Sequence, residues 1–200
     1  MIDSLRNHAL EVLSFSWPIV AISVIVAITL RVAYFISNMK KPVIYEELFK
    51  LFFIIYILCL FQVVTYRDIA FAGVNYIPFK EIFRYDIGSG LFYKNVFGNM
   101  LLFLPYGIFV GYIIDNKKFR YVFILALVAS LSIEFTQLAI GRVFDIDDVI
   151  LNVIGASLGF VLYRLFGKIS DKIPKVFKNE IVLDVLSILL IGGLIWFLIP

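Results

Sequence analysis

Residues 119–140 read FRYVFILALVASLSIEFTQLAI, and only Arg120 and Glu134 carry a charge within these 22 residues. An α-helix rises about 1.5 Å per residue, so about 20 apolar residues cross the roughly 30 Å hydrocarbon layer of a bilayer. The stretch is therefore long and apolar enough to form a transmembrane helix. Its one acidic residue, Glu134, lies six residues before Ile140, which is about 9 Å inside the end of the stretch.

Five other stretches have the same character: 15–36, 48–66, 98–114, 148–166 and 181–199. Hydrophobic residues make up 62% of the 200 residues and charged residues 16%, whereas soluble domains average about 45–50% and about 25%. The mean hydropathy is +0.98. The sequence predicts an all-α fold, a polytopic membrane helix bundle with about six transmembrane helices.

We expect three consecutive parts along the chain. Residues 1–64 hold the first two transmembrane helices, residues 65–166 hold an outer loop and helices three to five, and residues 167–200 hold a cytoplasmic loop and the last helix. The first apolar stretch is expected to be retained, because its 22 residues exceed the apolar core of about 7–15 residues in a cleavable signal.

The distribution of lysine and arginine predicts the orientation. Twelve basic residues lie in the segments near 31–50, 115–120 and 164–180, and six lie before residue 15 or in 67–97 and 141–147. Because cytoplasmic loops are enriched in Lys and Arg, both termini and the 67–97 loop are expected to face outward.

Composition also argues against several classes of function. The net charge is only +3, with 18 basic residues against 15 acidic ones, and the basic residues lie in short segments rather than on one exposed face, so nucleic-acid binding is not expected. The single cysteine, Cys59, cannot form an intrachain disulfide, and no Cys/His cluster suggests a metal site. No cofactor is expected.

Polar residues from three expected spans are predicted to share one depth, near the outer mouth of the membrane. Ionisable groups inside a span cost about 2.5–3.5 kcal/mol at its centre and mark functional sites by default. Two interpretations stay open: a polar cup that is open outward and binds a ligand, or a buried network that ties the helices together, with Arg142 neutralising Glu134 or an aspartate. The residues concerned are Asn95, Asn99, Glu134, Gln137, Arg142, Asp145, Asp147, Asp148 and Asn152.

Two glycine pairs have the spacing for close helix packing. Gly107 and Gly111 lie four apart in the third span, as do Gly155 and Gly159 in the fifth. Small residues at this spacing let helix backbones approach each other in lipid. Alternatively, the glycines face lipid.

The 67–97 segment is rich in aromatic residues. Aromatic rings favour the headgroup level of a bilayer, so we expect the segment to lie on the membrane. Lys80, Arg84 and Lys94 would then face anionic headgroups or polymer phosphates, unless the segment is an ordinary interfacial belt without a specific ligand. The aromatic residues are Tyr76, Phe79, Phe83, Tyr85, Phe92 and Tyr93.

An ordered set of motifs within about residues 65–165 resembles the VanZ-like family. The resemblance implies a multi-pass protein of the bacterial cytoplasmic (inner) membrane, in a family whose namesake is linked to low-level teicoplanin resistance, and it supplies no biochemical mechanism. The motifs are Asn75-Tyr-Ile-Pro78-Phe79, Asn99-Met-Leu-Leu-Phe103-Leu-Pro105-Tyr-Gly107, Glu134-Phe-Thr-Gln137, Gly141-Arg142, Asp145, Asp148, Asn152, Gly155 and Gly159.

The favoured hypothesis is a non-enzymatic envelope protein that binds a lipid-linked polymer or glycolipid in the outward cup. Carboxylates and amides suit sugar hydroxyls, which both donate and accept hydrogen bonds. The expected ligand-binding residues are Asn99, Glu134, Gln137, Arg142, Asp145, Asp148 and Asn152.

The main alternative is a membrane-embedded enzyme that acts on a lipid-linked envelope substrate. Glu134 would be its general acid or base and Asp148 a second catalytic residue, with Arg142 holding a phosphate. In that alternative Asp145, Asp147 and Asp148 would offer oxygen ligands to a divalent metal. Transport has less support, because the inner halves of these spans lack a polar path. Homo-oligomerisation stays open.

Overall fold

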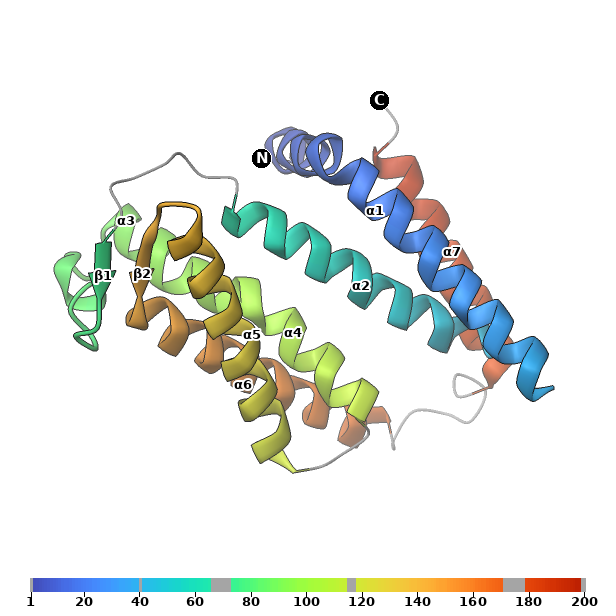
Figure 1. The fold of residues 1–200 in the computed structure, drawn as a ribbon. Coiled ribbons are helices and arrows are strands. Elements are labelled where there is room, and N and C mark those ends of the chain that lie inside the picture. The colour runs from blue at the N-terminus through green and yellow to red at the C-terminus, as the bar shows by residue number, and fades with distance from the viewer. Residues whose placement is uncertain (1, 40, 66–72, 115–117, 171–178, 199–200) are drawn as a thin grey trace. The chain divides into compact units, whose positions relative to one another are not determined.

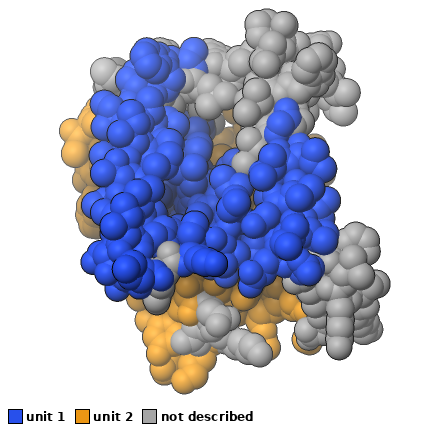
Figure 2. Space-filling view, turned by 90° about the vertical axis from the view of Figure 1, so that its right-hand side faces the viewer, with its two compact units in different colours: residues 1–63, 172–200 blue, residues 64–171 orange. Residues whose placement is uncertain are grey.

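The computed structural model describes residues 2–39, 41–65, 73–114, 118–170 and 179–198. For residues 2–13, 15–16, 169–170, 190–191 and 193–198 it describes the backbone alone. The chain divides into two compact units, coloured separately in Figure 2. Unit 1 comprises residues 1–63 and 172–200, and unit 2 comprises residues 64–171.

Unit 1 is built from three helices, α1 (Ile2–Asn38), α2 (Ile44–Thr65) and α7 (Glu180–Leu198), although the last two residues of α2 belong to unit 2. A bidentate ion pair joins the first two: Arg31 Nε lies 2.5 Å from Glu47 Oε2, and Arg31 Nη2 lies 2.6 Å from Glu47 Oε1. The Tyr45 N–H donates to Asp184 Oδ1 at 2.8 Å, which joins the start of α2 to α7.

Unit 2 contains three long helical paths, shown in Figure 1. The first begins as α3 (Gly90–Phe92), continues through the π-helical turn η2 (Tyr93–Phe97) and ends as α4 (Gly98–Ile114). The others are α5 (Phe119–Ala139) and α6 (Ile146–Ser170). The first path starts eight residues before the predicted 98–114. Ser89 caps its start by accepting the Phe92 N–H at 3.1 Å. Hydropathy did not predict this earlier start, because polar residues around Asn95 interrupt the apolar run.

Among the described elements, helices α4 and α6 make the most extensive contact, and glycines permit it. A Cβ atom on Gly107 would lie 1.8 Å from the Ala156 carbonyl oxygen, and one on Gly155 would lie 2.1 Å from that of Met100. Such distances are possible only for glycine. The predicted role of the two glycine pairs in close helix packing is confirmed, and the lipid-facing alternative is wrong.

Two short strands complete unit 2. Strand β1 (Gly73–Asn75) pairs in parallel with β2 (Val143–Asp145), with Val74 opposite Phe144. Three residues are too few for an alternating pattern, and the sequence reading did not predict them. The pair holds the segment before α3 against the start of α6 (Figure 1). That segment also contains a 3₁₀ turn, η1 (Ile82–Arg84).

Five helical paths in the described residues are long and apolar enough to cross a membrane. The all-α polytopic membrane fold is thereby confirmed. The sixth predicted span coincides with α7, whose side chains lie in part outside the described residues. The five are Trp17–Asn38, Ile44–Thr65, Gly90–Ile114, Phe119–Ala139 and Ile146–Lys168.

Candidate functional site

The end of α5 sets the position of the polar residues that follow it. Gly141 has a φ of +83°, its N–H donates to the Leu138 carbonyl at 3.1 Å, and the Arg142 N–H donates to the Gln137 carbonyl at 2.8 Å. These two bonds with a left-handed glycine form a Schellman motif, which ends a helix and turns the chain sharply. The turn directs the chain into β2 and the start of α6.

Glu134 is the most deeply buried ionisable residue on α5, with 1% of its surface exposed. Its Oε2 accepts the backbone N–H of Asp145 at 2.8 Å. Within the described part of the chain, its other oxygen has no hydrogen-bond partner and its carboxyl group makes no ion pair. The residue lies five positions before Ala139, about 8 Å inside the end of the helix. One oxygen of this carboxyl group therefore lacks, among the described residues, the partner that most buried polar atoms have.

Asp145 joins β1, β2 and α6. Its Oδ1 accepts the Asp147 N–H at 2.9 Å, which is the bond of a helix N-cap, and it also accepts Asn75 Nδ2 at 2.9 Å. Burial raises the pKa of the Asp145 carboxyl group, while these two hydrogen bonds oppose the rise. Asp145 is half-buried.

Asp147 is fully buried and accepts several backbone amides. Oδ1 accepts the Phe79 N–H, and Oδ2 accepts the N–H groups of Glu81 at 2.7 Å and Ile82 at 3.2 Å. We call this arrangement the Asp147 clamp. It fixes the segment between β1 and α3 to the first turn of α6, and it uses both oxygens of the carboxylate.

Two side-chain pairs join the long helices of unit 2. Asn99 Nδ2 on α4 donates to Asp148 Oδ1 on α6 at 2.5 Å, and Asn152 Nδ2 on α6 donates to Ser130 Oγ on α5 at 2.9 Å. Ser130 was not among the predicted site residues. It could have been predicted from the sequence, because Ser130 lies four residues before Glu134 and therefore on the same face of the helix.

Gln137 and Arg142 share one backbone partner near the end of α2. Gln137 Nε2 donates to the Val64 carbonyl oxygen at 2.9 Å, and Arg142 Nη1 donates to the same oxygen. Within the described residues Arg142 forms no direct ion pair with Glu134 or an aspartate, although its charge lies close enough to Glu134 for electrostatic interaction. The Schellman turn carries its guanidinium group to the end of α2 instead.

The three neighbouring aspartates point to separate partners. Asp145 is bonded to Asn75, Asp147 to loop amides and Asp148 to Asn99. In the described part of the chain, no group of three or more His, Cys, Asp or Glu side chains is placed to hold a metal ion. The arrangement therefore gives no support to the metal-binding alternative.

The predicted site residues come together at the end of unit 2 where α6 begins. Glu134, Gln137 and Asn152 are buried, and Asn99, Arg142, Asp145 and Asp148 are half-buried. Asp145, Asp148 and Arg142 all lie close enough to Glu134 for electrostatic interaction. We call these seven residues with Ser130 the Glu134 cluster. Asn95, on η2, is half-buried, and no described hydrogen bond links it to the cluster.

The fold and this cluster define a multi-pass membrane protein with polar side chains gathered at one end of a three-helix core. The chain belongs to the VanZ/LLP1 family, whose model matches residues 49–167. It is similar to Protein VanZ of Enterococcus faecium, with 36% identity over 78 residues. That match covers 38% of this chain and 48% of the relative, about half of its length. No solved structure matches the chain.

Proposed function

We propose that the Glu134 cluster binds the headgroup of a lipid-linked polymer or glycolipid in the outer leaflet of a bacterial cytoplasmic membrane. The observation that carries the proposal is Glu134 itself: a buried carboxyl group in a membrane-spanning helix, with one oxygen free of hydrogen bonds from the described residues. A buried polar atom without a partner costs about 1–3 kcal/mol. A ligand hydroxyl that donates to this oxygen would recover that free energy.

The chemistry of the surrounding residues suits a sugar. Carboxylates accept hydrogen bonds and amides both donate and accept, which matches the dual character of a hydroxyl group. The half-buried Asn99, Arg142, Asp145 and Asp148 would contact the ligand first. Arg142 adds a positive charge for a headgroup phosphate. The buried Ser130–Asn152 pair would hold the helices in place beneath the ligand.

Family membership connects the proposal to antibiotic susceptibility. The VanZ-like resemblance implies a link to glycopeptide resistance, specifically to teicoplanin. Teicoplanin carries a lipid chain, and binding of an envelope glycolipid would alter how such a molecule reaches the cell surface. The cluster is the only large group of buried polar side chains in the described part of the membrane-spanning helices, so it is the part of the protein that we assign to this effect.

A second candidate function is a membrane enzyme that acts on a lipid-linked envelope substrate. Glu134 would serve as general acid or base, and Asp148, which lies close enough for electrostatic interaction, would assist it. The same unsatisfied oxygen supports this candidate, because a catalytic carboxyl group also needs a free site for the proton it transfers.

Mass spectrometry of envelope lipids, together with teicoplanin susceptibility, separates the two candidates. Cells that lack the protein are compared with cells that make wild type, Glu134→Gln or Ser132→Ala. The glutamine keeps the size of the side chain and an oxygen for the Asp145 N–H. Ser132 is an exposed residue of α5 bonded to its own helix backbone, so its alanine variant is the control.

The binding proposal predicts that wild type and Ser132→Ala lower teicoplanin susceptibility without changing the lipids, and that Glu134→Gln loses the effect. A lipid species that is made or consumed only with an intact Glu134 would support the enzyme instead. Full activity of Glu134→Gln, at equal amounts of folded protein, would contradict both candidates.

A further inference from the structure

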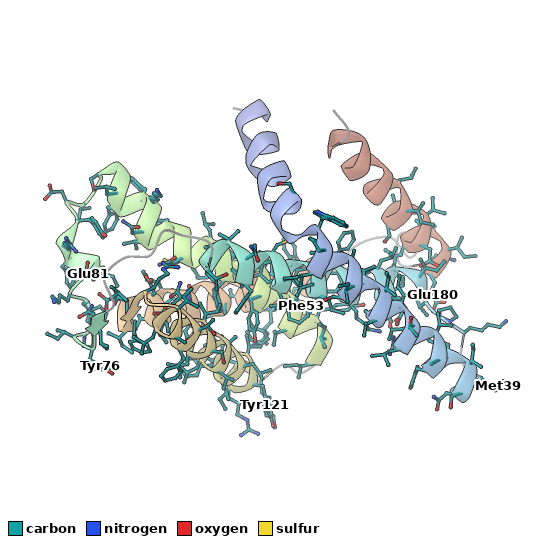
Figure 3. All side chains as sticks on the ribbon, turned by 45° about the horizontal axis from the view of Figure 1, so that its top comes forward. Met39, Phe53, Tyr76, Glu81, Tyr121 and Glu180 are labelled. Atoms are coloured by element: carbon teal, nitrogen blue, oxygen red, sulfur yellow. The ribbon has the colours of Figure 1, made fainter. Side chains whose placement is uncertain are left out.

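The segment between β1 and the following helix exposes large apolar side chains. Phe83 is 77% exposed and Ile87 86% exposed, and Tyr76, Ile77 and Phe79 are exposed as well. We call residues 76–89 the wedge loop. In Figure 3 its Tyr76 and Glu81 lie at one end of unit 2, and Tyr121 of α5 lies toward the other end.

The wedge loop is held in shape by hydrogen bonds that its backbone N–H groups donate to buried side chains. The Asp147 clamp binds the N–H groups of Phe79, Glu81 and Ile82, and Asn75 Oδ1 accepts the Ile77 N–H at 3.3 Å. Phe79 has a φ of +67°, a conformation that is rare for bulky residues. Its N–H is one of the three in the clamp, so the carboxylate stabilises the strained residue directly.

The charged residues of the loop fit a membrane surface. Four charged residues, Lys80, Glu81, Arg84 and Asp86, are interspersed among the apolar side chains, and Arg84 Nη1 donates to Glu81 Oε2 at 3.0 Å. Two basic and two acidic residues leave the loop without net charge, so apolar contact rather than charge must drive its association. Aromatic residues prefer the headgroup level, where long basic side chains reach toward water.

The position of the loop along the chain sets its depth. Ile87 lies three residues before Gly90, where a candidate membrane span begins. Because the loop is covalently continuous with that span and is clamped to the first turn of α6, it is held at the membrane surface. A loop in this position that exposed Phe83 and Ile87 to water would leave their apolar surface hydrated, at a cost of about 1.5–3 kcal/mol for each side chain.

We propose that the wedge loop inserts Phe83 and Ile87 into the headgroup–acyl boundary of the bilayer, and that the Asp147 clamp holds the loop in the inserted shape. The partner is therefore lipid, next to the Glu134 cluster. This inference does not depend on what that cluster binds.

Fluorescence quenching tests the insertion. The full-length protein, with Cys59→Ala, carries one new cysteine labelled with the environment-sensitive dye NBD and is reconstituted in phosphatidylglycerol–phosphatidylethanolamine vesicles. The test positions are Phe83→Cys and Ile87→Cys. Asp86→Cys, a polar exposed neighbour, is the control within the loop.

We expect blue-shifted emission at positions 83 and 87, strong quenching by doxyl groups carried on the lipid, and weak quenching by aqueous iodide. Position 86 should show the opposite preference. Strong iodide quenching at 83 and 87 would overturn the proposal. Blue-shifted emission without lipid quenching would also overturn it, because a second protein surface rather than lipid would then cover the loop.

Asp147→Asn tests the clamp with the same probe at position 83. The amide group of asparagine cannot accept the full set of backbone N–H groups, so lipid quenching should fall and iodide quenching should rise. A probe at Leu101→Cys, an exposed position on α4, reports whether the helices still fold, and Glu81→Gln is the matched control. Unchanged quenching at position 83 in Asp147→Asn would show that the Asp147 clamp does not hold the loop in its inserted shape.

Discussion

Two buried carboxyl groups in unit 2 differ in how fully they are hydrogen-bonded. Asp147 accepts three backbone N–H groups through both oxygens, whereas Glu134 accepts one N–H through one oxygen. A saturated carboxylate has little capacity left for a ligand. This difference assigns Asp147 to the structure of the loop and leaves Glu134 available for chemistry.

Asp145 gives the site a predictable response to pH. Its pKa is raised above the ordinary value, with burial as the largest cause. A carboxyl group with a raised folded-state pKa contributes stability below its unfolded pKa, and this contribution is lost as pH rises through the folded pKa. Lowering the pH from neutral toward about 4 should therefore raise the Tm of wild type relative to Asp145→Asn.

Thermal unfolding in detergent micelles across this pH range measures the difference between the two proteins. Asp86→Asn, which removes an exposed carboxyl group from the wedge loop, is the control and should track the wild type. A Tm difference between wild type and Asp145→Asn that stays constant with pH, or changes in the opposite direction, would contradict the argument.

At the scale of single residues, the sequence identified most polar residues of the Glu134 cluster but not their hydrogen-bond partners. Glu134 and Asn152 stand out because polar groups are expensive within apolar stretches. The partner of Arg142 could not be read in the same way, because it depends on the sharp turn at Gly141 and on where the end of α2 lies. Ser130 escaped notice because serine is ordinary in membrane helices.

At the scale of elements, the contact between α4 and α6 depends on glycines. A methyl group at Gly155 would collide with the Met100 carbonyl, whereas one at Gly167, near the end of the same helix, would meet nothing within 4 Å. Overpacking a close contact costs about 1–3 kcal/mol. Gly155→Ala should lower the stability of the folded protein by this amount, and Gly167→Ala should not.

Unfolding in mixed micelles with increasing SDS measures both variants. Alanine is the better helix former by about 1 kcal/mol, so Gly167→Ala is expected to be neutral or slightly more stable. Equal stability of Gly155→Ala and Gly167→Ala would contradict the argument that the close contact between α4 and α6 requires glycine at position 155.

Hydropathy predicted the long helices well and the short elements poorly. The stretch 119–140 corresponds to α5, Phe119–Ala139, because a long and largely apolar segment satisfies its backbone groups in lipid by forming a helix. Strands β1 and β2 contain three residues each and pair across a long sequence separation, so nothing local marks them. The π-helical turn at Tyr93–Phe97 was missed because polar residues among its five residues interrupt the apolar run on which the prediction rests.

At the scale of the whole molecule, the orientation in the membrane follows from loop charge and stays a prediction. Cysteine labelling in intact cells tests it, with a membrane-impermeant reagent applied to Asp86→Cys and Arg120→Cys in a Cys59→Ala background. We expect reagent added outside to label a cysteine at position 86 and to leave position 120 unlabelled. The reverse pattern would place the Glu134 cluster on the cytoplasmic side.

The division of the chain into three consecutive parts also stays a proposal, while the structure groups residues 1–63 with 172–200. The family match covers residues 49–167, which includes all of the Glu134 cluster. We propose that recognition belongs to unit 2 and that the helices of unit 1 serve as a membrane scaffold.

Native mass spectrometry of the purified protein tests the central claim most directly. Wild type, Glu134→Gln and the control Ser132→Ala are extracted from bacterial envelopes in the same mild detergent. We predict that wild type and Ser132→Ala retain a lipid-linked polymer or glycolipid, and that Glu134→Gln, equally folded, has lost it. If all three proteins carry the same bound species, or none carries any, the Glu134 cluster is not a ligand site.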